Sequence, residues 1–337
     1  MRLWSYLTAR RNEELLRRLR KRSSWICSLG SFGLLAGIST CYIARWDAVA
    51  ALTLFPFWAW GIAGLGLSGA AWRLGGGRCP ALLCLVWIAI SFFLSDDLSN
   101  LVSLRRKGPT SNPTKCLRVV TLNCAGQVVA AEEIASCKPD IVLLQESPAS
   151  NDVARLAKAW FGAEGSFLAG LDGSILARGH LTAAPGPKTV RFVRGTLGLG
   201  DGKEIEVVSL RLEPPETNFE LWSPACWQAH TRNRQKRRDQ LRQLLTEMEG
   251  AKAGRPCIVG GDFNAPAGDA IFRLLRGFLK DSFREAGAGW SNTALNSFPV
   301  VRVDQIWTDE RTQAIGARVK KTQNSDHRMV ICDLELQ

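Results

Sequence analysis

The sequence predicts an α+β domain with a core of two β-sheets, preceded by an N-terminal third embedded in a membrane. Three observations support this prediction. Long uncharged apolar runs are confined to residues 25–94, short β-rich runs begin at Cys116, and several of these short runs are continuously apolar. Continuous apolar strands are typical of central strands that are covered on both faces. A chain of 337 residues is long enough for about two such units.

The apolar runs of the first third have lengths suited to crossing a membrane. Residues 25–44 and 48–72 form runs of 20 and 25 residues, and a bilayer core requires about 20. A third run, 79–94, has 16 residues and is followed by two aspartates that lipid would not accommodate unpaired. A cleaved signal peptide would explain only one run. We therefore expect two to three transmembrane helices within residues 24–97, with three favoured.

The charge distribution predicts how these helices are oriented. Residues 1–23 carry eight Lys/Arg, so the positive-inside rule places this basic tail in the cytoplasm. Three spans would put the rest of the chain outside the cytoplasm, and we expect an integral protein of a bacterial inner membrane. If the third run does not span, the C-terminal domain is cytoplasmic. Of the net charge of +12, only +3 belongs to residues 108–337, which weakens the case for a dedicated nucleic-acid binder.

A linker and a folded domain are expected after the membrane region. Residues 98–115 are rich in Ser, Asn, Pro and Gly, which indicates a linker, and the domain spans 116–337. The ten cysteines show no CxxC spacing, so neither a zinc site nor a thioredoxin-like motif is indicated. The expected strands are 117–123, 140–146, 173–178, 205–212, 257–264, 302–307 and 329–336. The clearest helix is 227–249, where leucines and a methionine recur at helical spacing.

Polar residues stand at the ends of these strands. They are Asn123, Glu146, Asp262, Asn264, Asp304 and the pair Asp326-His327. In the stretch GGDFNAP, period-two alternation places Asp262 and Asn264 on one face and Phe263 on the other. Each of these motifs taken singly is more typical of a turn than of a catalyst. Their combination is more informative than any one of them.

The segments LRVVTLNCAG, DIVLLQE, GGDFNAP, RVDQIW and SDHRMV, in this order, resemble the endonuclease/exonuclease/phosphatase superfamily, which includes deoxyribonuclease I. The resemblance covers residues 116–337. It implies a four-layer α/β sandwich, in which two packed mixed β-sheets are flanked by helices and the active site lies at one end. It also implies hydrolysis of phosphoesters that depends on Mg²⁺, with Mn²⁺ as the alternative ion.

The resemblance further implies a metal-binding set. Glu146 would be the principal metal ligand, Asn123 would lie beside it, and Asp326 would assist directly or through water. Mg²⁺ prefers such oxygen ligands and retains several waters.

The remaining polar residues would act on the substrate. His327 would contact the scissile phosphate or take a proton from the attacking water, and Asp304 would orient His327. Asp262 would position or deprotonate that water, while Asn264 would hold a phosphate oxygen. Whether Asp262 or His327 is the base stays open at this point.

Two departures from the family pattern carry hypotheses of their own. Arg211 stands where the family usually has His, and a guanidinium binds phosphate but does not act as a base near pH 7. We expect Arg211 to clamp the substrate phosphate, the alternative being an outward-facing surface residue. The segment 222–240 has two tryptophans and five Lys/Arg within 232–238. A solvated helix face is the default for it, with nucleic-acid or anionic-lipid binding as alternatives.

The combined interpretation is a membrane-anchored, Mg²⁺-dependent phosphoester hydrolase. We expect a phosphodiesterase that acts on nucleic acid or phospholipid headgroups by metal-assisted attack of water. The alternatives are a phosphomonoesterase of the same fold and a catalytically impaired binding module tethered to the membrane. The membrane is contacted through the N-terminal helices, and no protein partner is inferable.

Overall fold

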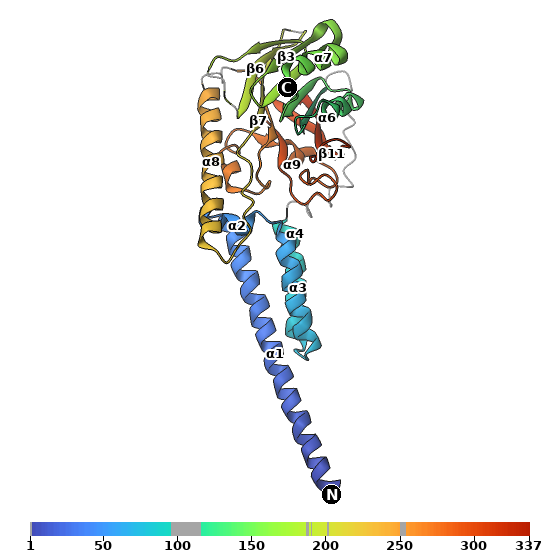
Figure 1. The fold of residues 1–337 in the computed structure, drawn as a ribbon, viewed down its shortest axis with the longest axis vertical. Coiled ribbons are helices and arrows are strands. Elements are labelled where there is room, and N and C mark those ends of the chain that lie inside the picture. The colour runs from blue at the N-terminus through green and yellow to red at the C-terminus, as the bar shows by residue number, and fades with distance from the viewer. Residues whose placement is uncertain (1, 96–115, 187–188, 190, 201, 250–253) are drawn as a thin grey trace. The chain divides into compact units, whose positions relative to one another are not determined.

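A computed structural model describes residues 2–95, 116–186, 189, 191–200, 202–249 and 254–337 (Figure 1). The chain divides into two compact units, Met1–Leu98 and Ser99–Gln337, and each is described by itself. The expected linker, 98–115, lies outside the described residues.

The N-terminal unit is helical. Helix α1 (Arg2–Ala44) runs for 43 residues, so the expected basic tail is part of one continuous helix with the first apolar run. The short elements η1 (Asp47–Val49) and α2 (Ala50–Thr53) precede α3 (Phe57–Arg73), and α4 (Arg78–Leu94) follows. Pro56 directly precedes α3, and proline lacks the N–H that a continuous helix would need there.

The expectation of two to three spans is overstated. Within the described residues, one helix, Asn12–Ala44, is long and apolar enough to cross a membrane. The second expected run is divided into 47–53 and 57–73, bent by 72°, and adds a second span only if this pair is counted as one. Helix α4 has 17 residues, which corresponds to about 26 Å against a hydrocarbon core of about 30 Å.

Small residues and hydroxyl groups join the three longer helices of this unit. Ser31 on α1 donates to the Gly64 carbonyl of α3 at 3.1 Å and lies 2.7 Å from the Ser68 hydroxyl. The indole N–H of Trp87 on α4 donates to Ser31 at 2.9 Å. A Cβ on Gly64 would lie 1.9 Å from the Trp87 ring. This glycine therefore allows α3 and α4 to approach closely, as small residues do in membrane helix pairs.

The C-terminal unit contains two six-stranded mixed sheets within the described residues. The first has the order β11-β12-β1-β2-β4-β3 and the second β5-β6-β7-β8-β10-β9. The first sheet comprises β1 (Cys116–Asn123), β2 (Ile141–Gln145), β3 (Gly165–Ala169), β4 (Gly173–Arg178), β11 (Thr312–Lys320) and β12 (Met329–Leu336). The second comprises β5 (His180–Ala183), β6 (Phe192–Gly198), β7 (Glu204–Arg211), β8 (Cys257–Asp262), β9 (Lys280–Asp281) and β10 (Asp304–Thr308). The pairs β1–β2 and β7–β8 are parallel.

Helices cover the outer faces of the two sheets. Helices α6 (Val128–Glu132) and α7 (Ser150–Phe161) lie against the first sheet, and α8 (Pro224–Glu249) lies along the second (Figure 1). The 3₁₀ segments η4, η5 and η6 (Glu133–Cys137, Gly162–Glu164 and Ala270–Arg273) and α9 (Ser282–Ala286) complete the unit.

The burial pattern follows from strand alternation. Val119 packs between the two sheets and Val120 packs under the helices of the first sheet, because successive side chains of a strand point to opposite faces. The outer core of the second sheet packs Val259 against Leu241 and Leu244 of α8. The four-layer α/β sandwich expected from the sequence is confirmed.

All seven expected strands are present, with ends displaced by at most two residues. Strands β3, β5, β6, β9 and β11 were not predicted. The expected helix 227–249 corresponds to α8. The interpretation of the basic segment 222–240 as a solvated helix face is wrong. Arg234 and Arg237 are buried, and the Arg234 guanidinium lies 3.0 Å from the Asp269 carboxylate.

Candidate active site

The parallel strand pairs bring the polar strand ends together. Asn123 is aligned with Gln145 at the ends of β1 and β2, and Arg211 is aligned with Asp262 at the ends of β7 and β8. Asp304 begins β10 directly opposite Asp262. The ends of parallel strands lie at one end of their sheet, which is where α/β folds usually bind ligands. Here the polar strand ends of both sheets contact each other, because Asn123 of the first sheet bonds to Asp262 of the second.

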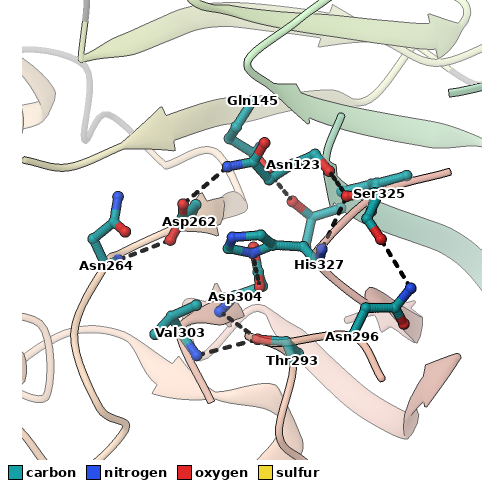
Figure 2. Close-up of polar contacts among 12 residues, drawn as sticks. Asn123, Gln145, Asp262, Asn264, Thr293, Asn296, Val303, Asp304, Ser325 and His327 are labelled. Carbon is teal, nitrogen blue, oxygen red and sulfur yellow. Dashed lines mark hydrogen bonds and ion pairs between the residues drawn. The ribbon is translucent and has the colours of Figure 1, made fainter. Parts of the chain in front are cut away.

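His327 is held from two sides. Its Nδ1 lies 2.8 Å from Asp304 Oδ2, and its backbone N–H donates to Ser325 Oγ at 3.0 Å (Figure 2). Ser325 Oγ in turn donates to the Asn123 carbonyl at 2.6 Å. The imidazole is thereby oriented with Nδ1 on the carboxylate, which leaves Nε2 as the nitrogen available to a substrate.

Asn123 links two of the carboxylates. Its Nδ2 donates to Glu146 Oε1 at 3.0 Å and to Asp262 Oδ2 at 3.1 Å. Its Oδ1 accepts from the Ala125 N–H at 3.0 Å. The residue that ends β1 therefore holds the expected metal ligand and the expected water-positioning residue in one network.

Arg211 lies inside this cluster. Its Nη2 is 2.6 Å from Glu146 Oε1 and its Nη1 is 3.3 Å from Asp172 Oδ2. The interpretation of Arg211 as an outward-facing surface residue is therefore wrong. The guanidinium contacts Glu146 Oε1, an oxygen of the carboxylate expected to bind the metal. The residue expected to clamp the phosphate is therefore in direct contact with the expected metal ligand.

Two site residues have left-handed backbone conformations. Glu146 has φ 42° and Asn264 has φ 50°, a region that non-glycine residues seldom occupy and that costs on the order of 1–3 kcal/mol each. Strand β8 ends at Asp262, so the period-two argument that put Asp262 and Asn264 on one face does not extend to Asn264. The Asn264 side chain donates instead to the Leu212 carbonyl at 2.9 Å. Phe263 is fully buried in the core, as expected.

The electrostatics of the buried pair are set by burial and by neighbouring carboxylates. Burial, reinforced by the charge of Asp304, raises the pKa of Asp262 to about 6. Burial by itself would lower the pKa of His327. The charge and hydrogen bond of Asp304, together with two further carboxylates, outweigh burial and raise this pKa to about 10. The imidazole therefore carries its proton at neutral pH.

The donor chemistry of the site fits a divalent cation. Ligand atoms of Asp262, Asp304 and His327 lie within 4.8 Å of one another, and Asp304 Oδ1 is buried without a hydrogen-bond partner among the described residues. A metal ion held by these three residues would require the His327 imidazole to lose its proton, whereas the ligand set expected from the sequence lies at Glu146, Asn123 and Asp326. The Glu146 side chain is 34% exposed.

Of the expected site residues, Asp326 has the fewest contacts with the others. Its side chain is exposed and makes no hydrogen bond or ion pair with a described residue, whereas its backbone carbonyl accepts from the Asn296 N–H at 2.7 Å. Its charge contributes to the raised pKa of His327. Asp326 therefore lies close enough to influence the site electrostatically.

Supporting residues from loops complete the arrangement. Thr293 Oγ1 accepts from the backbone N–H groups of Val303 and Asp304, and Asn296 Nδ2 donates to the Ser325 carbonyl at 2.8 Å (Figure 2). Neither residue, nor Asp172, belongs to a recognisable motif. Ser325 could have been found because it opens the SDH stretch. Gln305 accepts from the Trp307 indole at 3.1 Å and is structural.

Comparisons with known proteins show the family and the fold. The model of the Endonuclease/Exonuclease/phosphatase family matches residues 120–327. A family protein from Bacteroides vulgatus is similar in structure, with TM-score 0.52, 16% identity, and coverage of 66% of this chain and 100% of that one. A mannosyl-6-phosphatase from Bacteroides thetaiotaomicron has TM-score 0.50, 16% identity, and coverage of 65% and 99%.

A functionally unknown conserved protein from Enterococcus faecalis has TM-score 0.51, 15% identity, and coverage of 66% and 100%. Identities this low show the fold alone. A search of curated protein sequences found no match. The family match spans most of the chain and contains every expected catalytic residue, so the protein belongs to the endonuclease/exonuclease/phosphatase family of phosphoester hydrolases.

Proposed function

We propose that this chain is a membrane-anchored, Mg²⁺-dependent phosphodiesterase that acts on a nucleic acid or a phospholipid headgroup. The proposal rests on three sets of contacts within the site. They are Asp304–His327, Asn123–Asp262 and Asn123–Glu146–Arg211. They combine an oriented imidazole, a buried carboxylate and an oxygen-rich metal side, which are the groups that water attack on a phosphoester requires.

Glu146 would hold the metal ion, with Asp326 and Asn123 as its assisting ligands. A bound Mg²⁺ would neutralise charge on the phosphoryl oxygens. For Asn123 to offer its oxygen, the hydrogen bond from the Ala125 N–H to Oδ1 must be shared or released. Glu146 and Asp326 are both accessible, so they could take up an ion without rearrangement of the core.

His327 would donate from Nε2 to a phosphate oxygen, and Asp304 would keep the ring oriented and protonated. This leaves Asp262 as the group that positions the attacking water and accepts its proton. One oxygen of Asp262 is fixed by the Asn264 N–H at 2.9 Å and the other by Asn123 at 3.1 Å. The carboxylate is therefore pre-oriented for this task.

Arg211 would clamp the substrate phosphate, as expected from the sequence. In the structure it pairs with Glu146 and Asp172, so metal binding at Glu146 would release Nη2 toward the phosphate. Asn264 would bind a phosphate oxygen once its amide leaves the Leu212 carbonyl.

The anchor would be the apolar part of α1. The basic residues of its first turns favour a cytoplasmic N-terminus, and an odd number of spans then places the C-terminal domain outside the cytoplasm. A reporter fused to the C-terminus tests this. Activity only of a reporter that requires the cytoplasm would indicate two spans or none.

The deciding experiment uses the full chain purified in detergent, with Mg²⁺ or with EDTA. A soluble diester, a soluble monoester, DNA and phospholipid are tested in parallel, with Asp262→Ala as the inactive control. Turnover of a diester that EDTA abolishes supports the proposal. Preference for the monoester would make the chain a phosphomonoesterase, and absence of metal-dependent turnover on all four would leave the impaired binding module.

A further inference from the structure

The most exposed apolar side chains of the C-terminal unit lie on three loops. Five of them are at least half exposed among its described residues: Trp222 (83%), Phe298 (72%), Leu171 (64%), Leu295 (61%) and Phe219 (50%). We call these five residues the apolar rim. The remaining large apolar side chains with notable exposure, Val129, Phe167 and Phe278, range from 36% to 44%.

Each of the three loops is attached to the active site. Leu171 precedes Asp172, whose carboxylate contacts Arg211 and whose carbonyl accepts from the Ser147 N–H at 2.9 Å. Phe219 and Trp222 lie on the loop that starts after Arg211 and leads into α8. Leu295 and Phe298 lie on the loop whose Ala294 pairs with His327. Each loop that carries rim residues is therefore connected to a residue of the polar site: Asp172, Arg211 or His327.

The backbone of the loop that carries Leu295 and Phe298 is held in place by hydrogen bonds. Leu295 has φ 62°, an unfavourable conformation for a bulky residue. Its neighbour Asn296 is tied down by hydrogen bonds to the Thr322 and Ser325 carbonyls at 2.7 and 2.8 Å, and the Phe298 N–H donates to the Leu295 carbonyl at 2.8 Å. Local strain maintained by such bonds points to function.

The loop that carries Phe219 and Trp222 is also fixed. The Asn218 carbonyl lies 2.7 Å from His230 Nε2 and accepts from the Cys226 thiol at 3.1 Å. The Trp227 indole donates to the Leu221 carbonyl at 2.9 Å. Buried groups of α8 thus hold this loop while its two aromatic side chains stay exposed. Exposed apolar groups on a fixed framework mark an interaction surface.

We propose that the apolar rim is a membrane-contacting surface and that the substrate is a phosphoester in the headgroup of a membrane lipid. This inference rests on the proposed hydrolase function. A lipid presents a phosphate joined to apolar chains, and here the loops connected to the expected phosphate-binding groups carry exposed apolar side chains. Tryptophan, phenylalanine and leucine at loop tips insert into the interfacial region of a bilayer.

The alternative macromolecule, a single-stranded nucleic acid, fits less well. Aromatic rings stack on bases, but Leu171 and Leu295 have no ring. A nucleic acid also requires cations along its backbone, whereas residues 108–337 have a net charge of only +3, and two arginines of the basic run in α8, Arg234 and Arg237, are buried. The same chain also carries a helix that is long and apolar enough to enter a bilayer, which would keep the catalytic unit near a membrane.

A crosslinking experiment tests the contact without using activity. The full chain is reconstituted into nanodiscs of phosphatidylcholine and phosphatidylglycerol, with p-benzoylphenylalanine replacing Trp222 or Phe298. After illumination we expect lipid adducts by mass spectrometry at these two positions. Replacements at Phe167 and Phe278 serve as matched controls and should give none. Absence of adducts at 222 and 298, or equal adducts at the controls, would overturn the proposal.

A kinetic comparison tests the substrate class. The double variant Leu295→Asn/Phe298→Ser keeps a residue that tolerates positive φ at 295. Relative to a soluble diester, its turnover of lipid phosphoester in the nanodisc should fall about tenfold or more. The control Phe278→Ser should leave this ratio unchanged. An unchanged ratio in the double variant, or an equal loss of DNA cleavage, would contradict the lipid assignment. Adducts without turnover of any phosphoester would contradict the proposed function and still support the membrane contact.

Discussion

The two units of this chain bury polar groups in opposite ways. In the N-terminal unit the outward face is apolar, with Trp25, Ile26 and Leu29 at least 60% exposed, and the interior contains neutral hydroxyl groups that bond to one another. In the C-terminal unit the interior contains charges, such as Asp304, Asp281 and Arg302. Neutral hydrogen bonds suit helices packed in an apolar solvent. Buried charges require partners, and the partners distinguish a catalytic cluster from a structural one.

The largest expected effect comes from removing the charge behind His327. Asp304→Asn should lower kcat on a soluble diester roughly 10³- to 10⁴-fold, because the imidazolium loses its partner. The midpoint of thermal unfolding, followed by circular dichroism, should fall less than it does for Asp281→Asn, because an imidazole that loses its partner can release its proton and the substitution also relieves repulsion between Asp304 and Asp262. Loss of activity together with loss of folding would assign this cluster a structural function instead.

The buried pair of Asp281 and Arg302 should behave in the opposite manner. Its closest atoms are 2.5 Å apart and both side chains are almost fully buried. Asp281→Asn should reduce the free energy of unfolding by about 3–5 kcal/mol, because Arg302 would be left uncompensated. Urea unfolding of the full chain measures this, with Asp239→Asn on the exposed face of α8 as the control.

The pH dependence of this pair follows from the direction of the pKa shift. Burial alone would raise the pKa of Asp281, but the charge and hydrogen bonds of Arg302 prevail and lower it below the ordinary value of 3.8. The pair should therefore stabilise the protein fully above that value and lose its contribution as pH falls through the lowered pKa. A stability difference between wild type and Asp281→Asn that persists at the lowest pH would contradict the assignment.

A packing change should affect the N-terminal unit alone. Gly64→Val would place a side chain against the Trp87 ring and should cost about 1–3 kcal/mol of helix packing. Gly66→Val on the same helix is the control, since a Cβ there meets nothing within 4 Å. Unfolding by sodium dodecyl sulfate in bicelles compares the two. Equal destabilisation by both variants would refute close packing at Gly64.

The smallest effect is expected for the hydroxyl network. Ser68→Ala removes the bond to Ser31 and should cost about 0.6 kcal/mol, the average for such bonds in membrane proteins. The control is Ser39→Ala, because the Ser39 hydroxyl has no hydrogen-bond partner among the described residues. The same detergent titration measures both variants. A loss above about 2 kcal/mol would show that neutral polar burial matters here as much as buried charge.

Much of the C-terminal fold was predictable because the apolar runs in the sequence coincide with the strands that are buried in the structure. Central strands such as β1, β2 and β8 are continuous apolar runs, and the polar residues at their ends are readable as a set. Strands β5 and β6 escaped prediction because edge and mixed-exposure strands lack a clear period. The span number was overestimated because apolar composition does not reveal a bend of 72° between residues 47–53 and 57–73.

The sequence by itself determined the two units, the central strands and the set of polar residues expected at the site, since these depend on composition, alternation and short motifs. Only the tertiary structure decided that Asn264 leaves the strand face, that Arg211 binds the Glu146 carboxylate, and that three separate loops connected to the site carry exposed apolar side chains. These features depend on contacts between residues far apart in the chain, such as Arg211 and Glu146, and a local pattern contains no information about such distances.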